Sequence, residues 1–252
     1  MIYFVGAGPG AVDLITVRGK ELLERADLII YAGSLVNPKL LDYAKKTCRT
    51  INSASLTLED VIALMEDAEG KGEMTVRLHT GDPSIYGAIR EQMDRLKEKG
   101  IAYTCVPGVS SFCGAAAALQ AEYTLPGVSQ SVIITRMEGR TPVPDKQQIA
   151  DYATHRATMV IFLSASLVYR LQEQLLEGGY ERDTKAAIVY KASWPEEQVF
   201  HCTVGTLADT ATAHGITNTA LFVVGDILAD AYERSLLYDP SFSHGCRKAK
   251  EE

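Results

Sequence analysis

The amino-acid sequence predicts an α/β protein of two domains, the first built on a mainly parallel sheet and the second on a mixed sheet. The chain has 252 residues, which suits one large domain or two of roughly 120 residues each. Short apolar runs alternate with helical patterns through the first half. In the second half, residues 186–191 and 198–203 are expected to pair as a hairpin with no helix between the two strands, which favours a mixed sheet.

The first half is expected to alternate strand and helix in the manner of a parallel sheet. Its strands are expected at residues 2–5, 28–31, 75–79 and 103–106. Its helices are expected at residues 17–26, 38–45, 57–68, 84–99 and 110–119. Helices in such an arrangement cover the two faces of the sheet.

The second half carries fewer helices between its strands. Strands are expected at residues 131–136, 159–163, 186–191, 198–203 and 221–225, and helices at residues 146–153, 167–177 and 204–213. We therefore expect domains at 1–115 and 120–240, with the boundary near residues 113–122. A polar tail, residues 241–252, is expected to be only partly ordered.

Composition and charge exclude several classes of protein. There are 25 Lys and Arg against 32 Asp and Glu, a net charge of −7, whereas a nucleic-acid partner normally requires a basic excess. The five cysteines form no C-x-x-C pair, so we expect reduced thiols and no metal site. The N-terminus breaks at Gly6 and no apolar run reaches about 18 residues, so neither a signal peptide nor a membrane partner is expected. A cytoplasmic location follows from these expectations.

A glycine-rich loop, Gly6-Ala7-Gly8-Pro9-Gly10, follows the first expected strand. With Ala11 it fits the relaxed G-x-G-x-x-A pattern of dinucleotide sites. Two details oppose that interpretation: Pro9 removes an amide donor, and Asp27 stands at the start of the second strand, where it cannot hold a ribose hydroxyl. A tight strand-to-helix turn remains the structural alternative.

Two further loops follow expected strands. Asp82 before Pro83 is typical of a helix N-cap with proline at the first helical position. Ser110 or Ser111 is a natural N-cap for the next helix, and neither lies in the G-x-S-x-G elbow of a nucleophile. Since the carboxyl ends of parallel strands share one edge of a sheet, the three loops together predict a small-molecule site.

Six segments stand in a characteristic order along the chain: VGAGPG (5–10), DLIT (13–16), ADLIIY (26–31), GDP (81–83), PGVSS (107–111) and LPGV (125–128). They resemble the S-adenosylmethionine-dependent tetrapyrrole (corrin/porphyrin) methylases over nearly the whole chain, to about Tyr238. Within that family, YAGSLV (31–36) and LLYDPSFSH (236–244) resemble the branch that methylates C11 of precorrin-4 in cobalamin biosynthesis. GDPSIYG (81–87) resembles its oxygen-independent form, which acts on the cobalt-loaded intermediate.

The resemblance implies a cleft between the domains, in which S-adenosylmethionine binds in a folded shape. It also implies that S-adenosylhomocysteine is a product and that the protein is a homodimer. A small-molecule tetrapyrrole would be the substrate, with its own C11 as nucleophile. No catalytic acid or base is assigned, because Ala32-Gly33-Ser34 stands where uroporphyrinogen methylases carry an aspartate. Carried over by position, the cofactor-contacting residues are Pro9, Thr80, Gly81, Asp82, Ile85, Tyr86, Ser110, Ser111, Leu163, Lys191, Ala192 and Ala220.

Substrate carboxylates would need basic partners. The basic residues nearest the expected loops and strand ends are each expected to be solvated surface charges; they are Arg77, Arg90, Arg136, Arg140 and Lys191. The alternatives to cobalt-precorrin-4 as substrate are metal-free precorrin-4 or another precorrin. Two other classes stay open: an NAD-linked oxidoreductase, and a non-catalytic ligand-binding module of the same fold.

Overall fold

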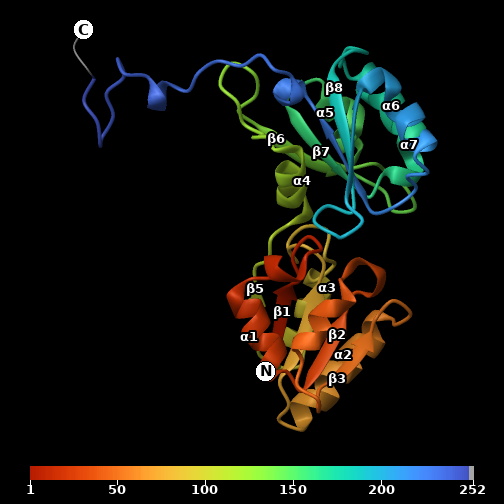
Figure 1. Cartoon of the computed structure of the whole chain (residues 1–252). Coiled ribbons are helices and arrows are strands. Elements are labelled where there is room, and N and C mark those ends of the chain that lie inside the picture. Colours follow the sequence, from red (N-terminus) through yellow and green to blue (C-terminus); the bar gives the residue numbers. More distant parts are fainter. Residues whose placement is uncertain (250–252) are drawn as a thin grey trace. The chain divides into compact units, whose positions relative to one another are not determined.

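The computed structural model describes residues 1–249, apart from the side chain of Ser34, and divides into two compact units. The first unit comprises Met1–Ala115 with Lys191–Glu197, and the second comprises Ala116–Tyr190 with Gln198–Glu252. Each unit holds one five-stranded sheet, and helices pack on the sheets (Figure 1). The expected fold class, an α/β domain with a parallel sheet followed by one with a mixed sheet, is confirmed. The last three residues of the expected tail, 250–252, lie outside the described residues.

The sheet of the first unit is parallel throughout. Its order is β3-β2-β4-β1-β5, built from β1 (Ile2–Gly6), β2 (Leu28–Tyr31), β3 (Arg49–Asn52), β4 (Thr75–His79) and β5 (Tyr103–Val106). Its helices are α1 (Val17–Arg25), α2 (Leu58–Gly70), α3 (Arg90–Glu98) and α4 (Ser111–Leu119), of which α4 crosses the boundary between the units. Because every strand runs the same way, the carboxyl ends of all five lie at one edge.

Two hydrophobic clusters cover the two faces of this sheet. Val5 of β1 packs in one cluster with Leu23 of α1. The neighbouring residue Phe4 packs in the other cluster with Met65 of α2. Successive side chains of a strand point to opposite faces, so strands covered on both faces read as continuous apolar runs. This is why the sequence predicts β2 to the residue.

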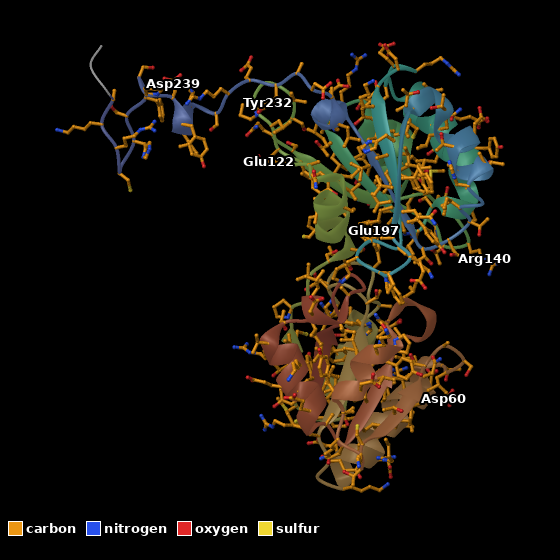
Figure 2. All side chains as sticks on the ribbon, viewed as in Figure 1. Asp60, Glu122, Arg140, Glu197, Tyr232 and Asp239 are labelled. Atoms are coloured by element: carbon orange, nitrogen blue, oxygen red, sulfur yellow. The ribbon has the colours of Figure 1, made fainter. Side chains whose placement is uncertain are left out.

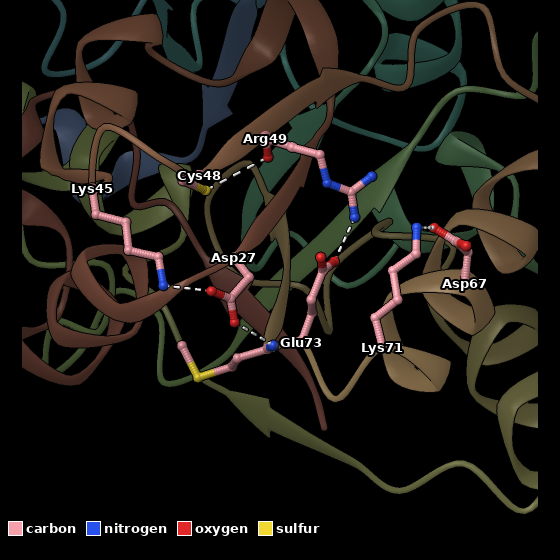
Figure 3. A network of polar contacts seen from close by, with 8 residues as sticks. Asp27, Lys45, Cys48, Arg49, Asp67, Lys71 and Glu73 are labelled. Atoms are coloured by element: carbon pink, nitrogen blue, oxygen red, sulfur yellow. Dashed lines mark hydrogen bonds and ion pairs between the residues drawn. The ribbon is translucent and has the colours of Figure 1, made fainter.

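The amino-terminal edge of the sheet is tied by Asp27 (Figure 3). Its carboxylate accepts hydrogen bonds from the amide of Met74 at 2.8 Å and from Lys45, while its carbonyl accepts one from the amide of Arg49 at 2.9 Å. The hydrogen bond from Lys45, then that from Met74, holds the pKa of Asp27 below its ordinary value. Asp27 therefore joins the starts of β2, β3 and β4, at the edge opposite the glycine loop.

Helix α2 begins with a capping box. The hydroxyl of Thr57 accepts a hydrogen bond from the amide of Asp60 at 3.2 Å, and the carboxylate of Asp60 accepts one from the amide of Thr57 at 3.0 Å. Asp60 is labelled in Figure 2. Both side chains satisfy amides that the first turn leaves without intrahelical partners. This motif starts the helix at Leu58, one residue after the expected start.

The second unit has a mixed sheet in the order β6-β7-β10-β8-β9. The strands are β6 (Val132–Arg136), β7 (Thr158–Phe162), β8 (Lys185–Tyr190), β9 (Gln198–Thr203) and β10 (Ala220–Val224), and the helices are α5 (Ile149–Ala153), α6 (Val168–Glu177) and α7 (Leu207–Ala213). Only the β6–β7 pair is parallel. The expected hairpin is confirmed, since β8 and β9 pair antiparallel from Lys185–Thr203 to Tyr190–Gln198. Within residues 1–249, no helix has the length and apolar character needed to cross a bilayer.

Three expectations about local structure were wrong. The helix expected at 84–99 begins only at Arg90, because Tyr86 (φ 55°) and Ala88 (φ 49°) adopt left-handed conformations that an α-helix does not contain. The segment expected as a helix at 38–45 is a 3-10 helix, Pro38–Tyr43. Strand β3 was not expected at all, because only Ile51 among its four residues is apolar.

Candidate functional site

Three loops meet at the carboxyl edge of the parallel sheet, and Asp82 ties two of them together. One carboxylate oxygen of Asp82 accepts a hydrogen bond from the amide of Gly108, in the loop after β5, at 2.8 Å. The other accepts from the amide of Ser84 at 2.8 Å and from the Ser84 hydroxyl. The expectation that Asp82 caps a helix was therefore wrong: it closes a turn and joins the β4 loop to the β5 loop.

Backbone contact between these loops leaves no room for side chains. The amide of Gly8 donates to the carbonyl of Gly81 at 3.2 Å, and the amide of Gly81 donates back to the carbonyl of Gly8 at 2.9 Å. A Cβ atom on Gly108 would lie 2.2 Å from the carbonyl oxygen of Gly81, and one on Gly6 would lie 2.5 Å from Cα of Gly108. Glycine at positions 6 and 108 is thus required for the loops after β1, β4 and β5 to touch.

The loop between β8 and β9, residues 191–197, packs on the glycine loop. The indole Nε1 of Trp194 donates to the carbonyl of Pro9 at 3.1 Å, and the hydroxyl of Ser193 accepts from the amide of Ala11 at 3.0 Å. The amide of Ser193 in turn donates to the carboxylate of Glu197, labelled in Figure 2. The sequence predicted the hairpin but gave no signal for where its loop would pack.

This packing argues against a dinucleotide site. The amides of Gly8 and Ala11 already donate within the protein, and Pro9 has no amide hydrogen. Helix α1 starts only at Val17, where Thr16 caps it by accepting from the amide of Gly19 at 3.1 Å. The glycine loop is therefore not the helix N-terminus on which a pyrophosphate binds.

Ten of the twelve residues expected to contact a cofactor belong to the first unit. A Cβ atom on Gly114 would lie 2.9 Å from Cβ of Pro9 and 3.5 Å from that of Ala192, so those two residues are neighbours. Gly81 lies equally close to Ser110 and Ser111, at 3.4 Å from its ideal Cβ position to the nearest atom of each.

Leu163 and Ala220 belong to the second unit. The antiparallel register that pairs Phe222 with Ile161 places Leu163 opposite Ala220, which itself pairs with Tyr190. They therefore lie together at the end of the sheet where the β8–β9 loop begins.

Backbone strain is concentrated at the expected site residues. Tyr86 (φ 55°), Leu163 (φ 53°) and Lys191 (φ 47°) all adopt left-handed conformations, as do Ala88 and Ser193 close to them in sequence. Such conformations cost free energy in residues other than glycine and cluster at functional sites. Strain thus marks the β4 loop and the β8–β9 loop of the first unit, and the end of β7 in the second.

A cavity of about 260 Å³ opens beside the β4 loop, within the first unit. Thr80, Ile85 and Tyr86 line it, together with side chains from the ends of β2 and β3 and from the start of α3. Arg77 and His79 of β4 line it as well. The expectation that Arg77 is a solvated surface charge was wrong, because its side chain is only 6% exposed.

The burial of Arg77 follows from the place of its strand in the sheet. Strand β4 is central, between β2 and β1, so both of its faces are covered. The signal in the sequence was a charged residue in the middle of the expected strand Thr75–His79, between Val76 and Leu78. Of the other expected surface charges, Arg90 and Arg140 are exposed, whereas Arg136 and Lys191 are half-buried.

His79 lies at the end of β4, as expected, and its ring stacks on Phe4 with the ring centroids 6.2 Å apart. Burial lowers the pKa of Arg77 to about 10, so it is charged at neutral pH. Burial, and then the charge of Arg77, lowers the pKa of His79 to about 3, so its imidazole is neutral. Within residues 1–249, no three His, Cys, Asp or Glu side chains converge as metal ligands.

Substituting Gly10 should displace the chain's single tryptophan. A Cβ atom there would lie 2.1 Å from Cδ1 of Trp194, so Gly10→Ala should shift the fluorescence emission to longer wavelength and destabilise the first unit by about 1–3 kcal/mol. Gly70→Ala is the matched control, because no atom lies within 4 Å of its ideal Cβ position. Wild-type emission in Gly10→Ala would contradict the packing of this loop.

Asp82→Asn should weaken the joined loops, because both carboxylate oxygens accept hydrogen bonds and an amide has only one accepting oxygen. Partial burial acts to raise the pKa of Asp82. The hydrogen bonds from Ser84 and Gly108 together outweigh this effect and hold the pKa below its ordinary value. We expect a loss of about 1–3 kcal/mol in urea unfolding followed by Trp194 fluorescence. The exposed Asp13→Asn should lose nothing, and equal stability of the two variants would return Asp82 to a capping role that asparagine can fill.

Acid should destabilise the first unit through His79. Its ordinary pKa is 6.5 and its folded pKa is about 3, so between these values the unfolded chain binds a proton that the folded chain does not. The free energy of unfolding should therefore fall, by up to about 1.4 kcal/mol per pH unit, as the pH drops below 6.5. His79→Gln should flatten this slope, while the exposed His155→Gln should keep it. Parallel curves for His79→Gln and wild type would rule the effect out.

Comparison with known proteins agrees with this geometry. A family model described as Tetrapyrrole (Corrin/Porphyrin) Methylases matches residues 1–208. Cobalt-precorrin-4 C(11)-methyltransferase of Methanocaldococcus jannaschii is 50% identical over 252 residues, which are 100% of this chain and 97% of the relative. The enzyme of the same name from Priestia megaterium is 44% identical over 251 residues, which are 98% of this chain and 97% of the relative. The solved structure of a cobalamin biosynthetic cobalt precorrin-4 methyltransferase has a TM-score of 0.88 at 44% identity, covering 90% of this chain and 95% of that one. The chain therefore belongs to the tetrapyrrole (corrin/porphyrin) methylase family.

Proposed function

We propose that the chain transfers the methyl group of S-adenosylmethionine to C11 of cobalt-precorrin-4, in the oxygen-independent branch of cobalamin biosynthesis. The observation that carries this proposal is the 50% identity, over the whole chain, to a cobalt-precorrin-4 C(11)-methyltransferase. The like-named solved structure, at a TM-score of 0.88, supports it independently of any single motif. The proposal includes a homodimer, as the resemblance implies.

The residues of the first unit fit this cofactor. S-adenosylmethionine carries a sulfonium and no phosphate, so it does not require the amide cradle that the glycine loop lacks. We propose the twelve residues named from the resemblance as its contacts. Pro9, Gly81, Ser110 and Ala192 would hold it through backbone and apolar contact, on loops that are fixed by their own hydrogen bonds.

The cofactor supplies a methyl carbon already activated by the positive charge of its sulfonium. The chain has therefore to orient the acceptor carbon and exclude water, and needs no metal or acid–base pair for the transfer itself. Asp82 would also position its neighbours among these contacts, because both of its carboxylate oxygens accept hydrogen bonds within the protein.

The test is incubation of the purified chain with methyl-labelled S-adenosylmethionine and cobalt-precorrin-4, with metal-free precorrin-4 in a parallel reaction. We expect one label at C11 of the cobalt substrate, located by mass spectrometry and NMR. Turnover of the metal-free substrate alone would contradict the assignment to the oxygen-independent branch. A label at another carbon would contradict the assignment of C11 as the methylated position. Calorimetry should show that S-adenosylhomocysteine binds with a micromolar dissociation constant, a binding free energy of about 8 kcal/mol, and that NAD does not bind. The reverse result would contradict the methylase proposal.

A further inference from the structure

Arg77 is a buried cation that lacks an acidic partner. Its side chain is 6% exposed, and no ion pair within residues 1–249 includes it. Removing an arginine from water without a counter-charge is costly, and buried charges are normally paired. The fold therefore carries an uncompensated positive charge in the middle of its central strand.

Two nitrogens of the guanidinium are held by the protein. Nε of Arg77 donates to the side-chain oxygen of Gln92 at 3.1 Å, and Nη1 donates to the carbonyl of Ile30 at 3.2 Å. Gln92 is itself oriented, because its amide nitrogen donates to the carbonyl of Ala88 at 3.0 Å. These bonds hold the planar group in one orientation, as a binding site for a planar anion requires.

The third nitrogen of the guanidinium is open. Nη2 makes no hydrogen bond within residues 1–249 and keeps some exposure to solvent. Arg77 lines the cavity of about 260 Å³, so the unused N–H groups are the donors that it can offer to a ligand there. The acidic residue in the lining, Glu91, is exposed and forms no ion pair with Arg77.

The remaining lining fits a carboxylate on a short apolar arm. Leu35, Leu56 and Ile85 provide apolar wall, and the hydroxyl-bearing side chains of Ser53 and Thr80 stand among them. The volume falls just below the roughly 300–1,000 Å³ of pockets that hold a whole drug-sized ligand, so the cavity suits one arm of a larger molecule.

We propose that this cavity, the Arg77 pocket, binds a carboxylate side chain of the tetrapyrrole substrate, with Arg77 as its anchor. The inference rests on the proposed function, because the substrate supplies the carboxylate. The α-carboxylate of the cofactor is the other source of the same chemistry. Thr80, Ile85 and Tyr86, three of the twelve proposed cofactor contacts, also line the pocket. The substrate is favoured because the rest of the lining extends toward β2 and β3, whereas Pro9, Ser110 and Ala192 gather at the loops after β1 and β5.

Two variants test the anchor in the full chain. Arg77→Met removes the charge, and Gln92→Glu keeps the arginine but gives it an internal carboxylate that competes with the ligand. Each should raise KM for cobalt-precorrin-4 about ten- to a hundredfold, as loss of a charge-assisted hydrogen bond predicts, with the affinity for S-adenosylhomocysteine unchanged. Arg90→Met is the matched control, because Arg90 is exposed and pairs with Asp94 at 2.9 Å; it should leave both values unchanged.

A binding measurement keeps the anchor separate from turnover. Cobalt uroporphyrin, an unreactive tetrapyrrole with many carboxylates, should quench the fluorescence of Trp194 in wild type and bind both pocket variants about tenfold or more weakly. If wild type binds cobalt uroporphyrin more tightly than both pocket variants do but transfers no methyl group, the proposed function fails and the pocket proposal stands. If wild type methylates cobalt-precorrin-4 and both variants bind tetrapyrrole as wild type does, the pocket proposal is overturned. Loss of S-adenosylhomocysteine affinity with unchanged tetrapyrrole binding would overturn it too, by assigning the carboxylate to the cofactor.

Discussion

The carboxylate of Asp82 holds the site of the first unit together. Parallel strands bring their carboxyl ends to one edge. Among the loops that follow them, those after β1 and β4 are joined by the reciprocal backbone hydrogen bonds of Gly8 and Gly81, and the loop after β5 needs a further connection. Asp82 supplies that connection, with one oxygen on Gly108 and the other on Ser84. The glycines at positions 6 and 108 let the loop backbones touch, so one charged side chain organises a surface made mostly of main chain.

Ionisable groups in and after β4 differ in what sets their pKa values: hydrogen bonds for Asp82, and burial for Arg77 and His79. Asp82 is partly buried but its carboxylate is fully hydrogen-bonded, and its pKa falls. Arg77 and His79 are more deeply buried, and there burial dominates and lowers the pKa of both bases. Burying the unpaired guanidinium of Arg77 costs folding free energy, and the proposed carboxylate of the substrate would neutralise that charge. The stability of the free protein and the recognition of the ligand are therefore coupled at β4.

The sequence predicted what depends on local patterns. Strands β1 and β2 were predictable because strands buried on both faces read as apolar runs, and the β8–β9 hairpin because no helical pattern separates its strands. Asp82-Pro83 misled because a turn closed by an aspartate and a helix N-cap use the same side chain and the same proline. The polar strand β3 and the burial of Arg77 were not predictable in this way. Both depend on where a strand lies in the sheet, and local sequence patterns do not determine the order of the strands. Which residues contact the cofactor stays a prediction.

Residues Lys191–Glu197 have a consequence for how the chain is made. They belong to the first unit although residues 116–190 of the second unit precede them, and their contacts with Pro9 and Ala11 span 185 and 182 positions of sequence. Contacts between such distant residues require closure of a long chain segment and are characteristic of slow folding. A fragment ending at residue 115 would leave the carbonyl of Pro9 and the amide of Ala11 without these partners. The glycine loop of the first unit is therefore completed only after the ribosome has added residues 116–190 of the second unit.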